Sequence, residues 1–174
     1  MPQVLVGIPD PSEYAPYYGR YIGLIKNDDI IAVLGQQAAE TTVLLRSFTE
    51  EASNRAYAPG KWNVKEVVGH MIDTERVFGS RALFIARKDP AALPGFEQDD
   101  WIRAASFSTE PFREQVDEFI CVRQSHLHFF RHLSAEAWHR RGIANRLEFS
   151  VRAVAYMIAG HERHHLEILR RRYV

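Results

Sequence analysis

The chain has 174 residues, of which 46% are hydrophobic and 25% charged, and its formal net charge is +0. This length suits one domain with a real core, residues 1–174. The balanced charge argues against a nucleic-acid partner, because no basic excess is present to neutralise phosphates. No window is long and apolar enough for a membrane span, and the start of the chain lacks a signal peptide. We therefore expect a cytoplasmic protein with neither a nucleic-acid nor a membrane partner.

Residues 1–29 predict an N-terminal arm that packs across the rest of the chain. Prolines and glycines interrupt regular structure there, yet a free tail seldom holds so many aromatic side chains. The arm's tyrosines are Tyr14, Tyr17, Tyr18 and Tyr21. We expect them to cover a seam between helices, and lining the mouth of a pocket is the alternative. Asp28 or Asp29 then caps a first helix over residues 30–51.

A capping box opens the second predicted helix, because Asn63 precedes Glu66 by three residues. Apolar residues at helical spacing continue to about Arg87. His70 lies on the flank of this apolar stripe, so its position alone does not decide between a surface residue and a metal ligand. Three other residues share its line along the helix: Thr74, Val77 and Arg81.

Residues 88–108 predict a long loop. Two turn sequences interrupt it, Asp89-Pro90 and Pro94-Gly95. Loops of this length in compact domains tend to be functional. The acidic pair Asp99-Asp100 is expected to be solvated, and one side chain overhanging a site is the alternative.

A third helix is predicted from about Pro111 to His132. Cys121 is the one cysteine of the chain, so no intrachain disulfide forms, and we expect it to be buried as a small hydrophobic residue. His128 and His132 are four residues apart and form a rival metal-binding pair. Their polar neighbours indicate a wetter surface, which ranks this pair second.

The end of the chain predicts a short helix over residues 134–140, a loop over residues 142–149 and a last helix capped by Ser150. No strand pattern stands out, apart from a short extended piece near Val4. Four long amphipathic helices predict an all-α fold, a four-helix bundle with a long N-terminal arm and a long loop between the second and third helices.

The last helix carries three histidines within five residues. His161 and His165 are four residues apart, which places both on one face, in the middle of the apolar stripe, whereas His164 is turned toward its edge. Two inward imidazoles one turn apart suit chelation of one borderline metal ion. As core residues, each would need its own buried hydrogen-bond partner. A third ligand would come from a facing helix, and His70 is the best upstream candidate.

Four segments resemble the DinB-like (DinB/YfiT) superfamily. They are Lys61-Trp62-Asn63-Val64-Lys65-Glu66 followed by Gly69-His70-Met71-Ile72-Asp73, then Ala159-Gly160-His161-Glu162-Arg163-His164-His165-Leu166, the arm segment Tyr14-Ala15-Pro16-Tyr17-Tyr18 and the loop segment Leu93-Pro94-Gly95-Phe96. The resemblance covers nearly the whole chain. It implies a four-helix bundle, often a homodimer, and one divalent metal ion, such as Ni, Zn, Fe or Mn. The matching ligand positions are His70, His161 and His165.

The resemblance also implies a class of activity. Characterised members resemble thiol transferases and isomerases that use a low-molecular-weight thiol such as bacillithiol or mycothiol, and others are described as metal-dependent hydrolases. We expect transfer of such a thiol to a small electrophile. The alternatives are a metal-dependent hydrolase and a non-catalytic, metal-stabilised stress-response or partner-binding module. Three imidazoles leave coordination positions open, whereas a fourth ligand such as Asp73 would indicate a structural site.

Asp73 and Glu162 are the acidic candidates for catalysis. Asp73 either orients a ligand imidazole or acts as a base, and an ion pair with Arg76 or Arg81 is its structural alternative. Glu162 is the base if His161-Glu162-Arg163-His164 is taken as a zinc-protease motif. Few residues follow that motif to supply its usual downstream ligand, which weakens the protease interpretation.

A di-iron carboxylate bundle is a further alternative. Two segments have the Glu-x-x-His spacing, Glu136 to His139 and Glu162 to His165. That architecture also needs two inward glutamates on other helices, for which Glu40 and Glu75 are the obvious residues. Because Glu136 lies on a short segment, we rank this alternative low.

Overall fold

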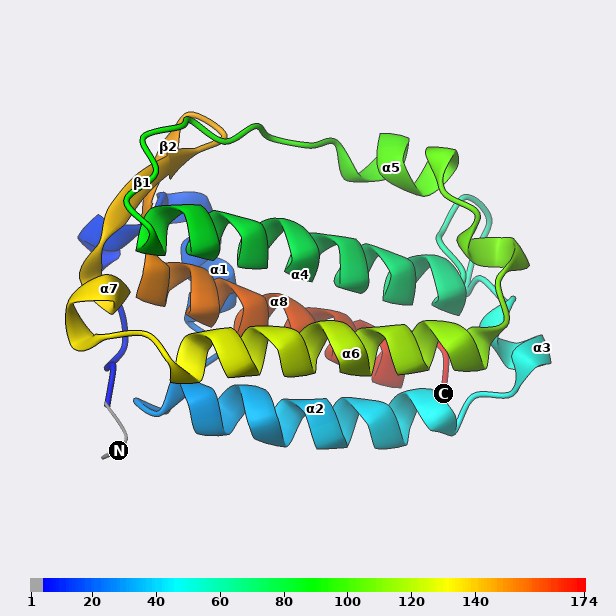
Figure 1. Ribbon diagram of the computed structural model, residues 1–174. Helices are drawn as coiled ribbons and strands as arrows, with labels where there is room; N and C mark the ends of the chain where they lie inside the picture. The colour runs from blue at the N-terminus through cyan, green and yellow to red at the C-terminus, as the bar shows by residue number, and fades with distance from the viewer. Residues whose placement is uncertain (1–4) are drawn as a thin grey trace.

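The computed structural model describes residues 5–174 and contains four long helices. They are α2 (Ile30–Arg46), α4 (Val64–Ala86), α6 (Phe112–Arg131) and α8 (Val151–Arg172). Helices α4 and α2 each pack against both α6 and α8, and Figure 1 shows α6 between α4 and α2. The first two bundle helices in the chain are therefore diagonal to each other. The predicted four-helix bundle is confirmed; Val4 lies outside the described residues.

The predicted caps set the helix starts. In α4, Glu66 N–H donates to Asn63 Oδ1 at 2.9 Å and Asn63 N–H donates to Glu66 Oε2 at 2.8 Å, which completes the capping box. Ser150 Oγ accepts from the backbone of Ala153 at 3.0 Å at the start of α8. Asp29 caps α2 in the same way. These local contacts explain why the starts of the bundle helices follow the sequence closely.

The described part of the N-terminal arm, residues 5–29, packs on α8. Its regular elements are η1 (Pro11–Glu13), η2 (Pro16–Tyr18) and α1 (Gly19–Ile22). The contact is closest at Gly160, where an added Cβ would lie 2.1 Å from the carbonyl oxygen of Tyr21. Buried Glu13 accepts a hydrogen bond from Arg152 Nε at 2.7 Å. Tyr156 Oη also donates to the carbonyl oxygen of Asn27 at 2.8 Å, so the arm contacts α8 at several points along the helix.

Two predicted boundaries are wrong. The first helix ends at Arg46, because Thr49 caps the separate helix α3 (Glu50–Ser53) by accepting from Ala52 N–H at 3.1 Å. Residues 88–108 are not all loop, since they contain α5 (Gln98–Ala104) and the short η3 (Phe107–Thr109). Figure 1 shows this segment running back along the outside of α4.

A β-hairpin replaces the predicted loop at residues 142–149. It follows the short helix α7 (Ala135–His139) and pairs β1 (Arg141–Ala144) with β2 (Leu147–Ser150) in antiparallel register. The two turn residues, Asn145 and Arg146, have φ values of 50° and 61°. Four-residue strands are too short to show alternation, and the turn lacks the usual glycine, so the sequence carries little hairpin signal.

A layer of buried polar side chains crosses the middle of the bundle and separates two apolar clusters. We call it the polar layer; its members are Gln37, Thr41, His70, Thr74, Glu75, Arg123, His161, Glu162 and His165. All four bundle helices contribute to it. Because buried polar groups need partners, this layer is where the fold is least like an ordinary apolar core.

The solvent-exposed face of α6 includes Cys121, which we predicted to be buried, and His128 of the second-ranked metal-binding pair. Cys121 is exposed, so the prediction that it is buried is wrong. It lies between Phe119 and Arg123, whose side chains turn inward, and a two-residue step on a helix points to the opposite side. His128 is exposed on the same helix, and His132 is exposed at its C-cap. No helix among residues 5–174 is long and apolar enough to cross a membrane.

Candidate metal centre

Three histidines from α4 and α8 converge within the polar layer. His70 Nε2 lies 3.0 Å from His161 Nε2, and His165 Nε2 lies 3.1 Å from the same atom. The three nitrogens lie within 4.8 Å of one another and form the one cluster of this kind among residues 5–174. Each side chain is less than a tenth exposed. The sequence prediction that His70 faces the α8 pair agrees with this arrangement.

Burial keeps these imidazoles neutral. It lowers the pKa of His70 to about 4, and it holds the pKa of His161 and His165 well below the usual range, helped by repulsion between the protonated rings. Thr74 Oγ1 lies 3.4 Å from His70 Nδ1. In the His70 tautomer that donates from Nδ1 to this hydroxyl, the lone pair is on Nε2 and faces the other two rings. At neutral pH all three rings are uncharged, as metal-ligating imidazoles are.

Two of the three nitrogen separations in the cluster fit one metal ion. Nitrogens bound to a common ion at about 2.1 Å stand about 3.0–3.4 Å apart for octahedral to tetrahedral angles. The two Nε2 separations of 3.0 and 3.1 Å fall in this range. Without an ion, Nε2 of His161 carries either one hydrogen or one lone pair, so it can form a good hydrogen bond with only one of its two neighbours and leaves the other without a partner in a buried place, which is costly.

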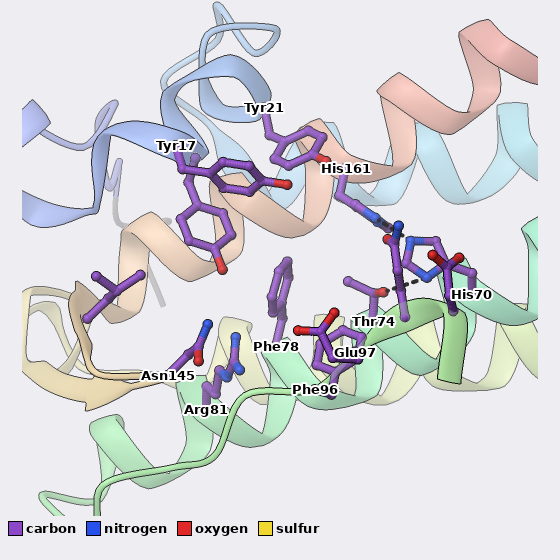
Figure 2. A pocket seen from close by; sticks show the side chains of 14 residues that line it. Tyr17, Tyr21, His70, Thr74, Phe78, Arg81, Phe96, Glu97, Asn145 and His161 are labelled. Carbon is purple, nitrogen blue, oxygen red and sulfur yellow. Dashed lines mark hydrogen bonds between the residues drawn. The ribbon is translucent and has the colours of Figure 1, made fainter. Parts of the chain in front are cut away.

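A pocket of about 430 Å³ opens beside the cluster. Figure 2 shows its walls, with His70 and His161 at one end and Arg81 and Asn145 toward the other. The lining comes from the arm (Tyr17, Tyr18, Tyr21), from α4 (His70, Thr74, Phe78, Arg81), from residues 96–99, from the hairpin (Asn145, Leu147) and from α8 (His161). His165 does not line the pocket, so the open side of the cluster is at His70 and His161.

The sequence profile of the DinB superfamily matches residues 34–169. The chain belongs to the DinB superfamily. No curated protein matches the sequence significantly. Among solved structures, one match is described as YfiT from Bacillus subtilis, a probable metal-dependent hydrolase with an unusual four-helix bundle topology. The TM-score is 0.73 with 17% sequence identity, over 84% of this chain and 89% of that chain. This structural likeness supports the four-helix bundle fold of this chain.

The arm tyrosines of this DinB-superfamily protein take both predicted roles. Tyr17, Tyr18 and Tyr21 line the pocket, which was the alternative expectation. Tyr14 and Tyr18 pack against the apolar core, as the seam interpretation requires. The Tyr21 ring lies 5.5 Å from the His161 ring, centroid to centroid. The arm therefore forms the wall of the pocket nearest to His161.

The structure does not bring Asp73 to the histidines. Asp73 lies 3.8 Å from Arg76 and lines a separate surface groove that also contains Trp101. Burial raises the pKa of its carboxyl. The ion pair with Arg76 was its structural alternative in the sequence analysis. Asp99 does line the pocket, and its charge acts on His70 in the direction that raises the pKa of the imidazole.

Glu162 also faces away from the point where the Nε2 atoms meet. Its carboxylate accepts a hydrogen bond from Thr41 Oγ1 and lies 2.6 Å from Arg123 Nη2. His164, the second histidine of the protease motif, is half-buried and is not part of the cluster. Glu162 is therefore an ion-pair partner inside the bundle and is not placed as the base of a zinc protease.

The four glutamates of the di-iron alternative do not come together. Glu75 is paired with Arg123, with Nε to Oε1 at 2.7 Å. Glu136 is an exposed partner of Arg140. Glu40 accepts a hydrogen bond from Gln36 on the surface of α2. A carboxylate-bridged pair of irons has no ligand set among the described residues.

Sequence reasoning missed the far end of the pocket, formed by Arg81 and Asn145. The sequence did contain one indication that Arg81 belongs to the site, because Arg81 lies on the same line along α4 as His70 and Thr74. Asn145 reaches the pocket through the hairpin turn, and the hairpin itself was not predicted.

Proposed function

We propose that His70, His161 and His165 hold one divalent metal ion, such as Ni, Zn, Fe or Mn, and that the adjoining pocket binds a small-molecule substrate. The observation that carries this proposal is the convergence of three neutral Nε2 atoms beside that pocket. The description of the Bacillus subtilis neighbour as a probable metal-dependent hydrolase supports it. When bound, such an ion lowers the pKa of a water or thiol that reaches it.

We infer that the reaction is transfer of a low-molecular-weight thiol, of the bacillithiol or mycothiol type, to a small electrophile. The thiol releases its proton to solvent, its sulfur forms a bond to the electrophilic carbon, and the leaving group departs with the electron pair of the broken bond. Neither Asp73 nor Glu162 reaches the cluster to act as a base. A thiol, with an unperturbed pKa of about 8.5, depends less on a base than water does.

The chain's own residues prepare the pocket for this chemistry. Thr74 orients the His70 ring through Nδ1. Tyr21 packs against His161 and excludes water from that side. The ring of Phe78 lies 6.2 Å from His161, centroid to centroid, and gives the wall beside the cluster an apolar surface. Such a wall favours an organic substrate over bulk water at the open side of the cluster.

A metal-dependent hydrolase is the second candidate function. Glu97 and Asp99 line the pocket, and a hydrolase would use one of these exposed carboxylates as its base. The description of the neighbour favours this class. A closed structural site is not supported, because the cluster among the described residues has three members and no fourth ligand.

The test is a parallel assay of both reactions on protein loaded in turn with each metal. Monochlorobimane is offered with bacillithiol, mycothiol or glutathione, and a nitrophenyl ester is offered without thiol. We expect thiol conjugation that is lost in His161→Ala and kept in the matched control His128→Ala, whose histidine is exposed on α6. Ester hydrolysis without thiol conjugation, abolished by Glu97→Gln or Asp99→Asn, would overturn the transferase proposal in favour of the hydrolase.

A further inference from the structure

Arg81 is a buried cation without an acidic partner. Its side chain on α4 is 3% exposed and lines the pocket. Nη2 donates to the carbonyl oxygen of Pro94 at 2.9 Å, and the hydroxyl of Tyr18 is a second neutral hydrogen-bond partner, whereas Nε is buried and has no hydrogen-bond partner. Within residues 5–174 no carboxylate forms an ion pair with it. Burial lowers the pKa of Arg81, yet a guanidinium stays charged in proteins.

Two other arginines, one fully buried and one largely buried, show what Arg81 lacks. Arg123 is enclosed by Glu75 and Glu162. Arg152 is paired with Glu13, which is itself buried. In both cases the chain supplies a carboxylate inside the fold to compensate the charge. At Arg81 the compensating group is absent and the guanidinium faces a cavity instead, which is the arrangement of a site for an external anion.

We propose that Arg81 binds the carboxylate group of the substrate whose reactive end lies at the three histidines. This inference rests on the proposed function, because it assigns the far end of that same pocket. His70 and Arg81 are eleven residues apart on one helix, so their Cα atoms are about 16 Å apart. The substrate is therefore elongated, with its reactive group and its carboxylate at opposite ends. Phe78 lies between them and contacts the guanidinium, which is 5.5 Å from the ring centroid.

A carboxylate fits this end better than a phosphate. Arg81 is one cation, and the same pocket contains Glu97 and Asp99, so a dianion would be repelled more strongly than a singly charged carboxylate. The planar guanidinium fork matches a planar carboxylate through two parallel hydrogen bonds. Asn145 adds a neutral amide close by, since its side chain lies against Gly95, the neighbour of the Pro94 that Arg81 holds.

The direct test is a titration of the isotope-labelled, metal-free protein, which prevents the carboxylate from binding to a metal ion. Butyrate is the probe, and butyramide is its neutral equivalent. The signal of the buried Arg81 Nε–H is followed by NMR and assigned by its loss in Arg81→Gln. We expect a saturable shift with butyrate and none with butyramide. No shift with butyrate, or equal shifts with both, would overturn the inference. Tighter binding of inorganic phosphate would overturn the choice of carboxylate.

Three variants test whether Arg81 binds the carboxylate in addition to its hydrogen bond to the Pro94 carbonyl oxygen. Arg81→Gln is expected to weaken butyrate binding, measured for all variants by isothermal titration calorimetry, roughly tenfold or more, as loss of a charged hydrogen-bond donor does. Arg87→Gln is the matched control, because Arg87 is exposed at the C-cap of the same helix, and it should bind as the wild type does. Asn145→Asp tolerates the positive φ and offers Arg81 an internal carboxylate, so it should weaken binding without loss of the fold. Unchanged affinity in Asn145→Asp or Arg81→Gln would contradict the assignment.

Failure of this inference is distinguishable from failure of the proposed function. Butyrate binding at Arg81 by a protein that takes up no metal would overturn the metal site alone. One metal ion per chain with no response at Arg81 would overturn the carboxylate site alone.

Discussion

Arg123 holds the bundle together at the polar layer, and its removal should be severe. Its guanidinium is fully buried and reaches the other three bundle helices. Nε and Nη2 donate to the two carboxylate oxygens of Glu75 on α4, at 2.7 and 2.8 Å. Nη2 also lies 2.6 Å from Glu162 on α8, and Nη1 donates to the Leu34 carbonyl oxygen on α2 at 3.2 Å. Arg123→Met removes the guanidinium from two buried carboxylates and leaves Glu75 with only the His126 ring, whose Nδ1 lies 3.3 Å from Oε1. We expect the free energy of unfolding to fall by about 3–5 kcal/mol.

Urea and thermal unfolding measure this loss, and the melting temperature should fall by about 6–20 °C. Without Arg123, burial raises the pKa of Glu75 and Glu162 in the folded state above the unfolded value of about 4.3. A raised pKa of an acid means that the folded state takes up the proton first. The penalty is therefore largest near neutral pH, and it shrinks as the pH falls through the raised pKa values.

Arg46→Met is the matched control for this prediction. Arg46 also joins α2 to α6, through Asp117 at 3.2 Å, but both side chains are more than half exposed. Exposed ion pairs contribute less than about 1 kcal/mol. An Arg123→Met variant no less stable than Arg46→Met, or a deficit that does not change with pH, would refute the reasoning about the polar layer.

Three further predictions concern single residues. Gly160→Ala should lower the free energy of unfolding, measured by urea titration, by about 1–3 kcal/mol, because the added Cβ would collide with the Tyr21 carbonyl oxygen. Gly35→Ala should raise it by about 0.5–1 kcal/mol, because an added Cβ has open space around it and alanine favours the helix. Metal-free protein should lose stability as the pH falls from about 6.5 toward about 4, the pKa of His70 in the folded state. In this pH range the imidazole is protonated in the unfolded chain but not in the folded one. A stability that does not change with pH would contradict the buried, neutral cluster. Cys121 should react with Ellman's reagent in the native protein nearly as fast as in urea, and strong protection would show that it is covered.

The sequence predicts the bundle well because its signals are local. Capping residues such as Asn63 and Ser150 act within one turn, and the apolar stripes repeat at helical spacing. The first helix was predicted too long because Thr49 begins a new helix only three residues after Arg46 ends the previous one. The hairpin was missed because its contacts are tertiary: Leu93 N–H donates to the Ile143 carbonyl at 3.0 Å.

The candidate site is predictable only in part. The spacing of His161 and His165 places two imidazoles on one face, and that inference needs only helix geometry. His70 could be decided only by resemblance, because helix packing determines whether a flanking residue turns inward. The ion pairs of Glu162 and Glu75 with Arg123 depend on how α4, α6 and α8 come together, which periodicity does not specify. The pocket wall at Arg81 depends on the hairpin in the same way.

The metal content of the protein tests the central claim most directly. It is measured by elemental analysis on protein purified without an affinity tag or a chelator, alongside His70→Ala, His161→Ala and the exposed control His128→Ala. We expect about one divalent ion per chain in the wild type and in the control, and none in the other two variants. Two irons per chain, or no metal in the wild type even after titration, would contradict the three-histidine site.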